Sequence, residues 1–420
     1  MSMTLAEKIL AHASRREQVR AGEIVSCHVD LAMMHDSSGP RRIRPKLEEL
    51  GVDVWDPSKV VIITDHFVGE TDSHSVQIQA LTRDWATQRP LGGYPEAQGI
   101  CHIVLPERGH LRPGMFVVGG DSHSTTGGAF GCFMTGIGAT DMAGVMATGS
   151  IWMRVPETLR VCVDGVLPDG IAAKDVILFL CHRIGINGAS YMAAEYTGSG
   201  VTAMPMDERM VLANMAVELG AKCGIVAADH TTRDWLAGAG VEVDDMDDWQ
   251  SDSDATIARD ITITAADLTP QVAAPHSPEN SATVDIHAGT AIDQAYIGAC
   301  TGAKLDDLRM VARIVDGQRV AEGVRFFVAP ASLRIAAAAE RDGTLETLRA
   351  SGATILHSAC GACIGLGPAR LGAGEVGISS SSRNFQGRMG DPSSQTYLSS
   401  PYTVAASALA GCIADPRDYL

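Results

Sequence analysis

The chain has 420 residues, of which 45% are hydrophobic and 20% are charged. This composition excludes a disordered chain and is typical of a globular enzyme of two or three domains. The formal net charge of −17 argues against a nucleic-acid or anionic-membrane partner, so an anionic substrate has to be met by a local cluster of positive charge.

The N-terminal segment MSMTLAEKILAHASRREQ has charges every few residues and no apolar stretch, which predicts a helix rather than a signal peptide. No apolar run approaches the roughly 18 residues of a membrane span. Ten cysteines in such a chain indicate the reducing cytoplasm, where thiols stay free to bind metal. Packing in the core is the expected role of the cysteines that stand singly: Cys27, Cys101, Cys132, Cys162, Cys181, Cys223 and Cys412.

Three blocks of an α/β protein follow one another along the chain. The predicted blocks are residues 1–157, 158–290 and 291–420. The last boundary follows a segment with prolines at 270, 275 and 278, which remove backbone donors and stiffen the chain.

Two strands of the first block each run into an acid–histidine motif. VVIIT at 60–64 precedes Asp65-His66, and MFVV at 115–118 precedes Asp121-Ser122-His123. A carboxylate orients a histidine and makes it more basic, which suits proton transfer near neutral pH. Either motif alone favours a hydrogen-bonded loop histidine, but two at strand ends favour a catalytic role. His102, in GICHIV, could reach Asp121.

In the second block, a helical pattern over 208–220 carries Asn214 and Glu218 four residues apart, so one face presents both. The flanking LANMA and VELGA are apolar, which disfavours a fully exposed polar pair. In the third block, Arg383 and Arg388 lie in a serine-rich loop after an apolar strand pattern. Arginine is suited to bidentate carboxylate binding, although surface arginines are common.

Three cysteines of the third block indicate a metal site. Cys300 follows a predicted strand at 294–298, with a predicted helix at 305–315 after it, and Cys360 and Cys363 follow a predicted strand at 354–356. Strand ends of an α/β sheet form the crevice that holds ligands. Zinc, a dithiol and an iron–sulfur cluster all remain open from the spacing alone. One Cys plus C-x-x-C would leave the fourth position of a [4Fe–4S] cluster open as a Lewis acid, and a thioredoxin-like context is missing.

Taken together, the motifs IGACTG, CGACIG, GDSHSTTGG, TDHF, NMAVELGA and SSRNFQGR occur in an order, across nearly the whole chain, that closely resembles the aconitase superfamily. Within it, the length is similar to that of large subunits of the isopropylmalate dehydratase and homoaconitase type. The resemblance implies three α/β/α domains around a [4Fe–4S] cluster held by Cys300, Cys360 and Cys363, and a hydro-lyase reaction that moves a hydroxyl between adjacent carbons.

Site residues follow from the same resemblance. The implied acid–base and hydrogen-bonding residues are Asp65, His66, His102, Asp121, Ser122, His123 and Glu218. The implied substrate or cluster contacts are Asn214, Arg383 and Arg388. In aconitases a serine on a mobile fourth domain removes the substrate proton. This chain ends without that domain, so we expect it on a separate small subunit.

Three positions depart from the usual family pattern, namely Gly302, Ser382 and Arg41. Polar contacts of this kind set specificity, so the substrate stays open among isopropylmalate, homoaconitate, citramalate and 2,3-dimethylmalate. A regulatory RNA-binding relative is disfavoured by the charge. A pure electron carrier needs a fourth cysteine near the cluster.

Overall fold

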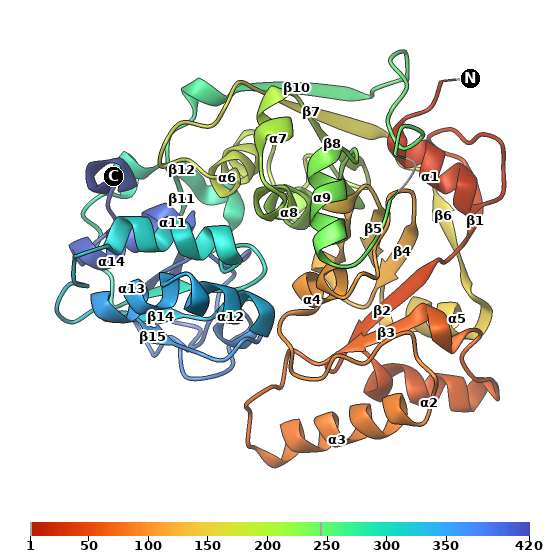
Figure 1. Ribbon diagram of the computed structural model, residues 1–420, viewed down its shortest axis with the longest axis horizontal. Helices are drawn as coiled ribbons and strands as arrows, with labels where there is room; N and C mark the ends of the chain where they lie inside the picture. Colours follow the sequence, from red (N-terminus) through yellow and green to blue (C-terminus); the bar gives the residue numbers. More distant parts are fainter. Residues whose placement is uncertain (1, 244–245) are drawn as a thin grey trace.

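The computed structural model describes residues 2–243 and 246–420. Figure 1 shows three groups of elements around a common centre, coloured red to orange, yellow to green, and cyan to blue. Each group has a sheet with helices packed against it, parallel in the first two groups and mixed in the third, which confirms the predicted α/β class. No helix in the described part of the chain has the length and apolar character needed to cross a membrane.

The first group is built on a four-stranded parallel sheet. Its strands, in spatial order, are β3 (Val60–Ile63), β2 (Leu31–His35), β4 (Phe116–Gly119) and β5 (Phe133–Gly136). A separate antiparallel pair consists of β1 (Ile24–His28) and β6 (Ser150–Arg154). The helices are α1 (Leu5–Ala13), α2 (Pro40–Leu50), α3 (Ser73–Thr87), α4 (Cys101–Glu107) and α5 (Ala139–Thr148). The N-terminal helix was predicted, and a capping box between Thr4 and Glu7 fixes its start.

The second group contains another four-stranded parallel sheet. Its strands, in spatial order, are β10 (Arg259–Thr264), β7 (Thr158–Asp164), β8 (Ala193–Thr197) and β9 (Cys223–Val226). Its helices are α6 (Ala173–Ile184), α7 (Ser199–Ala203), α8 (Met206–Met215) and α9 (His230–Gly238). The helix predicted over 208–220 is interrupted, because α8 ends at Met215 and a 3-10 turn, Ala216–Leu219, continues it. This tighter turn carries Glu218.

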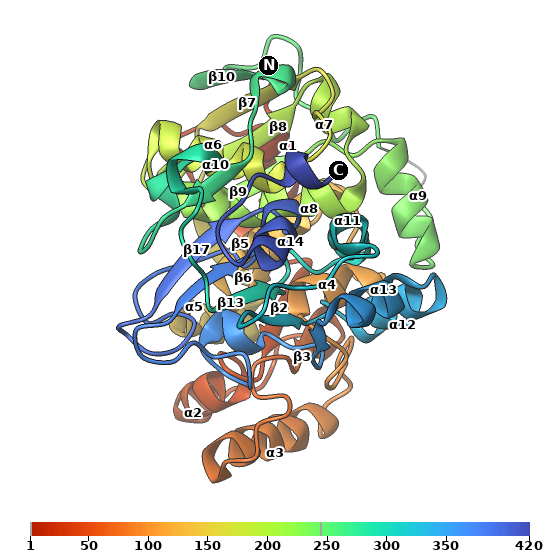
Figure 2. The same cartoon turned by 90° about the vertical axis from the view of Figure 1, so that its left-hand side faces the viewer.

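The third group has a seven-stranded mixed sheet. Its strands, in spatial order, are β12 (Ser281–Thr283), β11 (Gln271–Ala273), β17 (Gln395–Ser399), β16 (Val376–Ser379), β13 (Gln294–Ile297), β14 (Arg325–Val328) and β15 (Thr354–Ile355). Its helices are α10 (Val284–His287), α11 (Leu305–Val315), α12 (Leu333–Arg341), α13 (Thr344–Ser351) and α14 (Pro401–Ala410). Strand β17 contacts α6 of the second group, and Figure 2 shows this blue strand below α6.

The division of the chain at residue 290 stays a prediction, but the change of sheet comes earlier. The proline-rich segment before it contains β11 and β12, and β11 pairs antiparallel with β17 of the third sheet. The prolines at 270, 275 and 278 lie outside these two short strands, so the ladder keeps its donors. The third sheet therefore includes β11 and β12, which the sequence analysis places in the second block.

One buried apolar cluster joins the three groups. It includes Val117 of β4, Met210 of α8 and Val311 of α11, which are all essentially inaccessible to solvent. The groups therefore share a core and are held in a fixed arrangement around the strand ends described next.

Candidate active site

Three strands of the first sheet deliver acid and histidine side chains to the same edge. Strands β2, β3 and β4 are parallel neighbours, so their carboxyl ends lie together. His35 ends β2 and is followed by Asp36, and Asp65 with His66 comes two residues after β3. Asp121 comes two residues after β4. The predicted motifs Asp65-His66 and Asp121-His123 are thus brought to one edge by the topology.

Asp65 holds His66 in the predicted manner. The carboxylate Oδ1 lies 2.6 Å from Nδ1 of His66, and Oδ2 accepts the backbone N–H of Cys101 at 2.8 Å. Burial alone would lower the pKa of His66, but the carboxylates of Asp65, Asp36 and Asp121 raise it to about 9. These carboxylates therefore favour the protonated form of His66.

Asp121 binds a different histidine ring from the one next to it in sequence. Its Oδ1 lies 2.8 Å from Nε2 of His102 and accepts the backbone N–H of His123 at 2.8 Å. Against the effect of burial, these two histidines hold the pKa of Asp121 well below its ordinary value. The contact between His102 and Asp121, open from the sequence, is present.

The ring of His123 instead faces Glu218, at 3.0 Å between Nε2 and Oε1. Glu218 also accepts a hydrogen bond from Nε of Arg383 at 2.7 Å, and Nη1 of Arg383 donates to Ser122 Oγ at 3.0 Å. Burial would raise the pKa of Glu218, but His123 and Arg383 lower it. These contacts join residues of all three groups of elements. With Nε and Nη1 engaged, Nη2 of Arg383 is the nitrogen left for a carboxylate.

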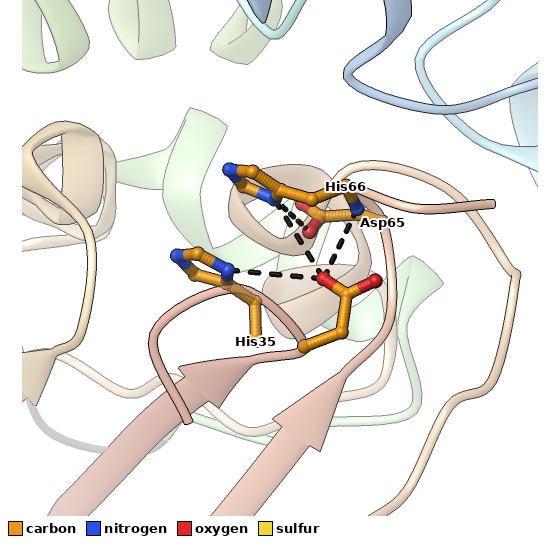
Figure 3. A group of neighbouring side chains, drawn as sticks. His35, Asp65 and His66 are labelled. Carbon is orange, nitrogen blue, oxygen red and sulfur yellow. Dashed lines mark hydrogen bonds and ion pairs between the residues drawn. The ribbon is translucent and has the colours of Figure 1, made fainter. Parts of the chain in front are cut away.

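Sequence reasoning missed two members of this cluster. His35 stacks on His66 with ring centroids 4.0 Å apart and planes 4° apart, as Figure 3 shows. Asp36 accepts the backbone N–H groups of His66 and Phe67 at 3.1 and 3.0 Å. The signal was available, because LAMM followed by His-Asp repeats the pattern of a strand that runs into an acid–histidine pair. We call the whole set the acid–histidine group: His35, Asp36, Asp65, His66, His102, Asp121, His123 and Glu218.

The three cysteines, here called the thiol group, come from the carboxyl edge of the third sheet. Cys300 follows β13. Cys360 precedes the 3-10 turn Gly361–Ile364 after β15, and Cys363 lies within that turn. Ala299 takes a left-handed φ of 66° just before Cys300, which turns the chain sharply at the strand end. The backbone N–H of Cys360 donates to the Asp65 carbonyl at 2.9 Å, so the two groups are neighbours.

These thiols fit a cluster better than a single ion. Within the described residues, two sets of possible metal ligands have all their ligand atoms within 4.8 Å, and the thiol group is not one of them. A single zinc ion holds thiolates at about 2.3 Å, which would keep each pair within about 4.6 Å. Burial, together with Cys363, raises the pKa of Cys300 to about 12. Buried thiols become thiolates when a cationic cofactor neutralises them.

Buried polar atoms beside the thiols support this fit. Asn214 donates to Cys300 Sγ at 3.1 Å and to Thr126 at 2.7 Å, so it contacts the thiol group rather than the arginines. Its Oδ1 and the hydroxyl of Tyr296 are buried without a hydrogen-bond partner among the described residues. Tyr296 and Gly361 line a cavity of about 90 Å³ next to the cysteine-bearing turn.

Lys174 of α6, which the sequence analysis also missed, contacts the serine-rich loop next to the thiol group. It is 1% exposed, and its Nζ donates to the carbonyls of Ser380 and Ser381 at 3.0 and 2.5 Å. Burial lowers its pKa to about 8. A single lysine among the apolar residues of AAKDVIL is a weak signal, because periodicity does not show where a buried amine points.

The remaining predicted positions are placed as follows. Arg388 lies on the loop after Arg383, and its Nε is buried without a hydrogen-bond partner in the part of the chain that the structure describes. A Cβ at Gly302 would overlap the side chain of Ser380, so the serine loop occupies the space beside this glycine. Ser382 Oγ is buried without a hydrogen-bond partner within residues 2–243 and 246–420, and Nε of Arg41 donates to the Ser37 carbonyl at 2.7 Å.

The chain matches the aconitase family (aconitate hydratase) over residues 7–290 and 285–411. It belongs to that family. It is 46% identical to "3-isopropylmalate dehydratase large subunit 1" of Methanopyrus kandleri, with 100% of both chains covered. It is 42% identical to the "3-isopropylmalate dehydratase large subunit" of Moorella thermoacetica, over 100% of this chain and 99% of that one. A "probable methanogen homoaconitase large subunit" of Methanothermobacter thermautotrophicus is 43% identical, over 99% and 98%.

Family membership and dehydratase relatives over the full length identify an enzyme of the hydro-lyase type. An iron–sulfur cluster is the cofactor expected in this family. All ten cysteines are free of disulfides, five of the seven outer ones are buried, and Cys162 and Cys412 are half-buried. The packing role predicted for the outer cysteines agrees with this placement.

Proposed function

We propose that this chain is the large subunit of a 3-isopropylmalate dehydratase, with one [4Fe–4S] cluster held by Cys300, Cys360 and Cys363. The observation that carries the proposal is the meeting of the thiol group with the acid–histidine group at the strand ends of two sheets. The dehydratase names of relatives at 42–46% identity favour this substrate. When bound, the cluster would supply a Lewis-acidic iron for the substrate hydroxyl.

The chain's own residues would handle protons and charge. His102 with Asp121, and His123 with Glu218, are histidine–carboxylate pairs suited to giving and taking protons near the leaving hydroxyl. Nη2 of Arg383 would hold a substrate carboxylate, and Arg388, on the same loop, would add a second positive charge. Both roles remain part of the proposal.

A small subunit completes the proposed enzyme, because the relatives are named large subunits. We propose that it carries the serine base. The free thiols fit the cytoplasm as the compartment. No nucleic acid or membrane enters the proposal.

The test uses the chain purified without oxygen and reconstituted with iron and sulfide. It should bind a brown cluster and dehydrate 3-isopropylmalate only after the small subunit is added. Homoaconitate, citramalate and 2,3-dimethylmalate are assayed in parallel, and homoaconitate is the second candidate because of the homoaconitase-named relative. Full turnover by the chain alone would refute the two-subunit arrangement, and a preference for another acid would refute the substrate.

A further inference from the structure

Two lysines of the described residues are fully buried, and their ammonium groups have different kinds of partner. Lys304 lies four residues after Cys300. Its Nζ forms an ion pair with Asp307 Oδ2 at 2.6 Å and donates to the Cys300 carbonyl at 3.2 Å. Burial would lower the pKa of Lys304, but Asp307 and Asp207 raise it. The charge of this lysine is therefore matched by a carboxylate of the protein.

Lys174 of α6 has no carboxylate of this kind. Among the described residues its Nζ donates to the hydroxyl of Thr301 at 3.3 Å and to the carbonyls of Ser380 and Ser381. These three acceptors are neutral. They satisfy the donors of an ammonium group but do not cancel its charge, and a buried charge without a counter-charge is costly. The hydrogen-bond partners of Lys174 therefore leave its charge unmatched.

The thiol group lies next to this lysine. Thr301, which accepts from Nζ, directly follows Cys300 in the chain. Burial lowers the pKa of Lys174 to about 8, and Cys300 has the largest of the effects that act against burial, with Cys363 also contributing. The negative groups that most favour the charged form of Lys174 are thus led by a cysteine of the thiol group.

The thiol group in turn needs a positive charge once it binds the proposed cluster. Metal binding converts the buried thiols to thiolates. Three thiolates carry more negative charge than an oxidised [4Fe–4S] core neutralises, so the loaded site is anionic. On the side of the first group of elements, Asp65 is paired with His66 at 2.6 Å. That pair leaves the charge of the thiolates unmatched.

We propose that Lys174 is the buried counter-cation of the loaded thiol group, and that its ammonium charge stabilises the thiolate-bound cluster and raises its reduction potential. An added electron makes the cluster more negative, so a fixed positive charge nearby stabilises the reduced form more than the oxidised form. Lys174 acts on the cofactor through its charge and does not contact the substrate. This inference rests on the proposed function for its cofactor.

Three replacements of Lys174 separate its charge from its hydrogen bonds. Lys174→Gln removes the charge and keeps an N–H donor, Lys174→Met removes both, and Lys174→Arg keeps the charge. The matched control is the double variant Lys304→Gln with Asp307→Asn. It neutralises the other buried lysine together with its carboxylate, so the net charge beside the thiols is unchanged.

The measurement is a redox titration of the reconstituted chain with dithionite, followed by electron paramagnetic resonance. One electron passes from dithionite to each oxidised cluster. Lys174→Gln and Lys174→Met should shift the equilibrium at least about tenfold toward the oxidised cluster, which is about 60 mV lower for a one-electron couple. Lys174→Arg and the double variant should stay within about threefold of wild type.

A wild-type potential in both Lys174→Gln and Lys174→Met would overturn the proposal, and so would a potential in Lys174→Arg as low as theirs. The unfolding temperature of each chain before reconstitution reports whether it is folded. If the folded Lys174→Gln chain takes up no iron but Lys174→Arg does, the charge is required for loading, as proposed. If neither takes up iron, packing and not charge is the role of this lysine.

The same experiment separates this inference from the proposed function. A wild-type chain that takes up no cluster would refute the cofactor and with it the role of Lys174. A loaded wild-type complex that does not dehydrate 3-isopropylmalate would refute the proposed substrate alone. The potentials of the Lys174 variants would still decide whether this lysine is the counter-cation.

Discussion

The acid–histidine group and the thiol group are neighbours, but the protein supplies hydrogen-bond and charge partners to the first group more completely than to the second. In the first, carboxylates face histidine nitrogens at 2.6–3.0 Å, and His102, His123 and Arg383 hold the pKa of Asp121 and Glu218 down. In the second, burial raises the pKa of Cys300 and Cys360, and the hydroxyl of Tyr296 has no partner. The fold thus preorganises the acid–histidine group, whereas the thiol group keeps buried polar atoms that the proposed cluster would satisfy.

The largest effect should come from removing a thiol. Cys300→Ser, Cys360→Ser and Cys363→Ser should each abolish cluster binding, because thiolates supply the soft ligands that iron needs. Iron content and visible absorbance after reconstitution are the measurements. Cys132→Ser and Cys223→Ser, which change equally buried cysteines outside the group, should keep nearly all the iron. Dependence on one of these and not on Cys300 would contradict the ligand assignment.

Next to the acid–histidine group, Arg383→Lys should reduce catalytic activity and leave the cluster content unchanged. The lysine keeps the charge but loses the planar fork that contacts Glu218 and Ser122. A charge-assisted hydrogen bond contributes about 1.5–3 kcal/mol, so turnover should fall and the Michaelis constant rise by at least about tenfold. Arg309→Lys, at an exposed ion pair with Asp342, is the control. Wild-type kinetics in Arg383→Lys would show that this arginine does not hold substrate.

Glu208 can be compared with the carboxyls of the acid–histidine group, because it is also buried but is not faced by those histidines. Burial, together with Asp307, raises its pKa from 4.5 to about 8. A raised pKa means that its contribution to stability is complete below about 4.5 and is lost as pH rises through about 8. Glu208→Gln should remove this slope. One pKa unit corresponds to about 1.4 kcal/mol, so the variant should gain at least that much on wild type between pH 5 and 9. Urea unfolding at each pH measures this gain, and parallel curves would contradict the assignment.

The smallest effect concerns Tyr296. We expect its buried hydroxyl to donate a hydrogen bond to a cluster sulfur, and such bonds raise the reduction potential. Tyr296→Phe should therefore lower the potential by up to about 60 mV, the equivalent of a tenfold change for a one-electron couple. A redox titration followed by electron paramagnetic resonance measures it. Tyr196→Phe removes another buried, unpartnered hydroxyl outside the site and should leave the potential unchanged. Equal potentials in all three proteins would place the Tyr296 hydroxyl out of reach of the cluster.

Local pattern predicted the elements that carry the chemistry. The helix expected at 305–315 is α11, and the strands expected at 60–64 and 294–298 are β3 and β13 within one residue at their ends. Apolar periodicity and the polar residue that ends each run are properties of neighbouring residues, so a linear reading detects them. The α-helix predicted over 208–220 ends at Met215, because tertiary packing around Glu218 favours a 3-10 turn there.

The sequence by itself determined the residue types at each strand end, the three cysteines and their resemblance to a family. Only the tertiary structure decided which groups face each other. His123 meets Glu218 across 95 positions, and Arg383 meets Ser122 across 261. His102 takes the carboxylate that the sequence assigns to His123, and His35 stacks on His66. Periodicity reports the face on which a residue lies, whereas the partner across that face is set by how whole sheets pack, which short-range pattern does not contain.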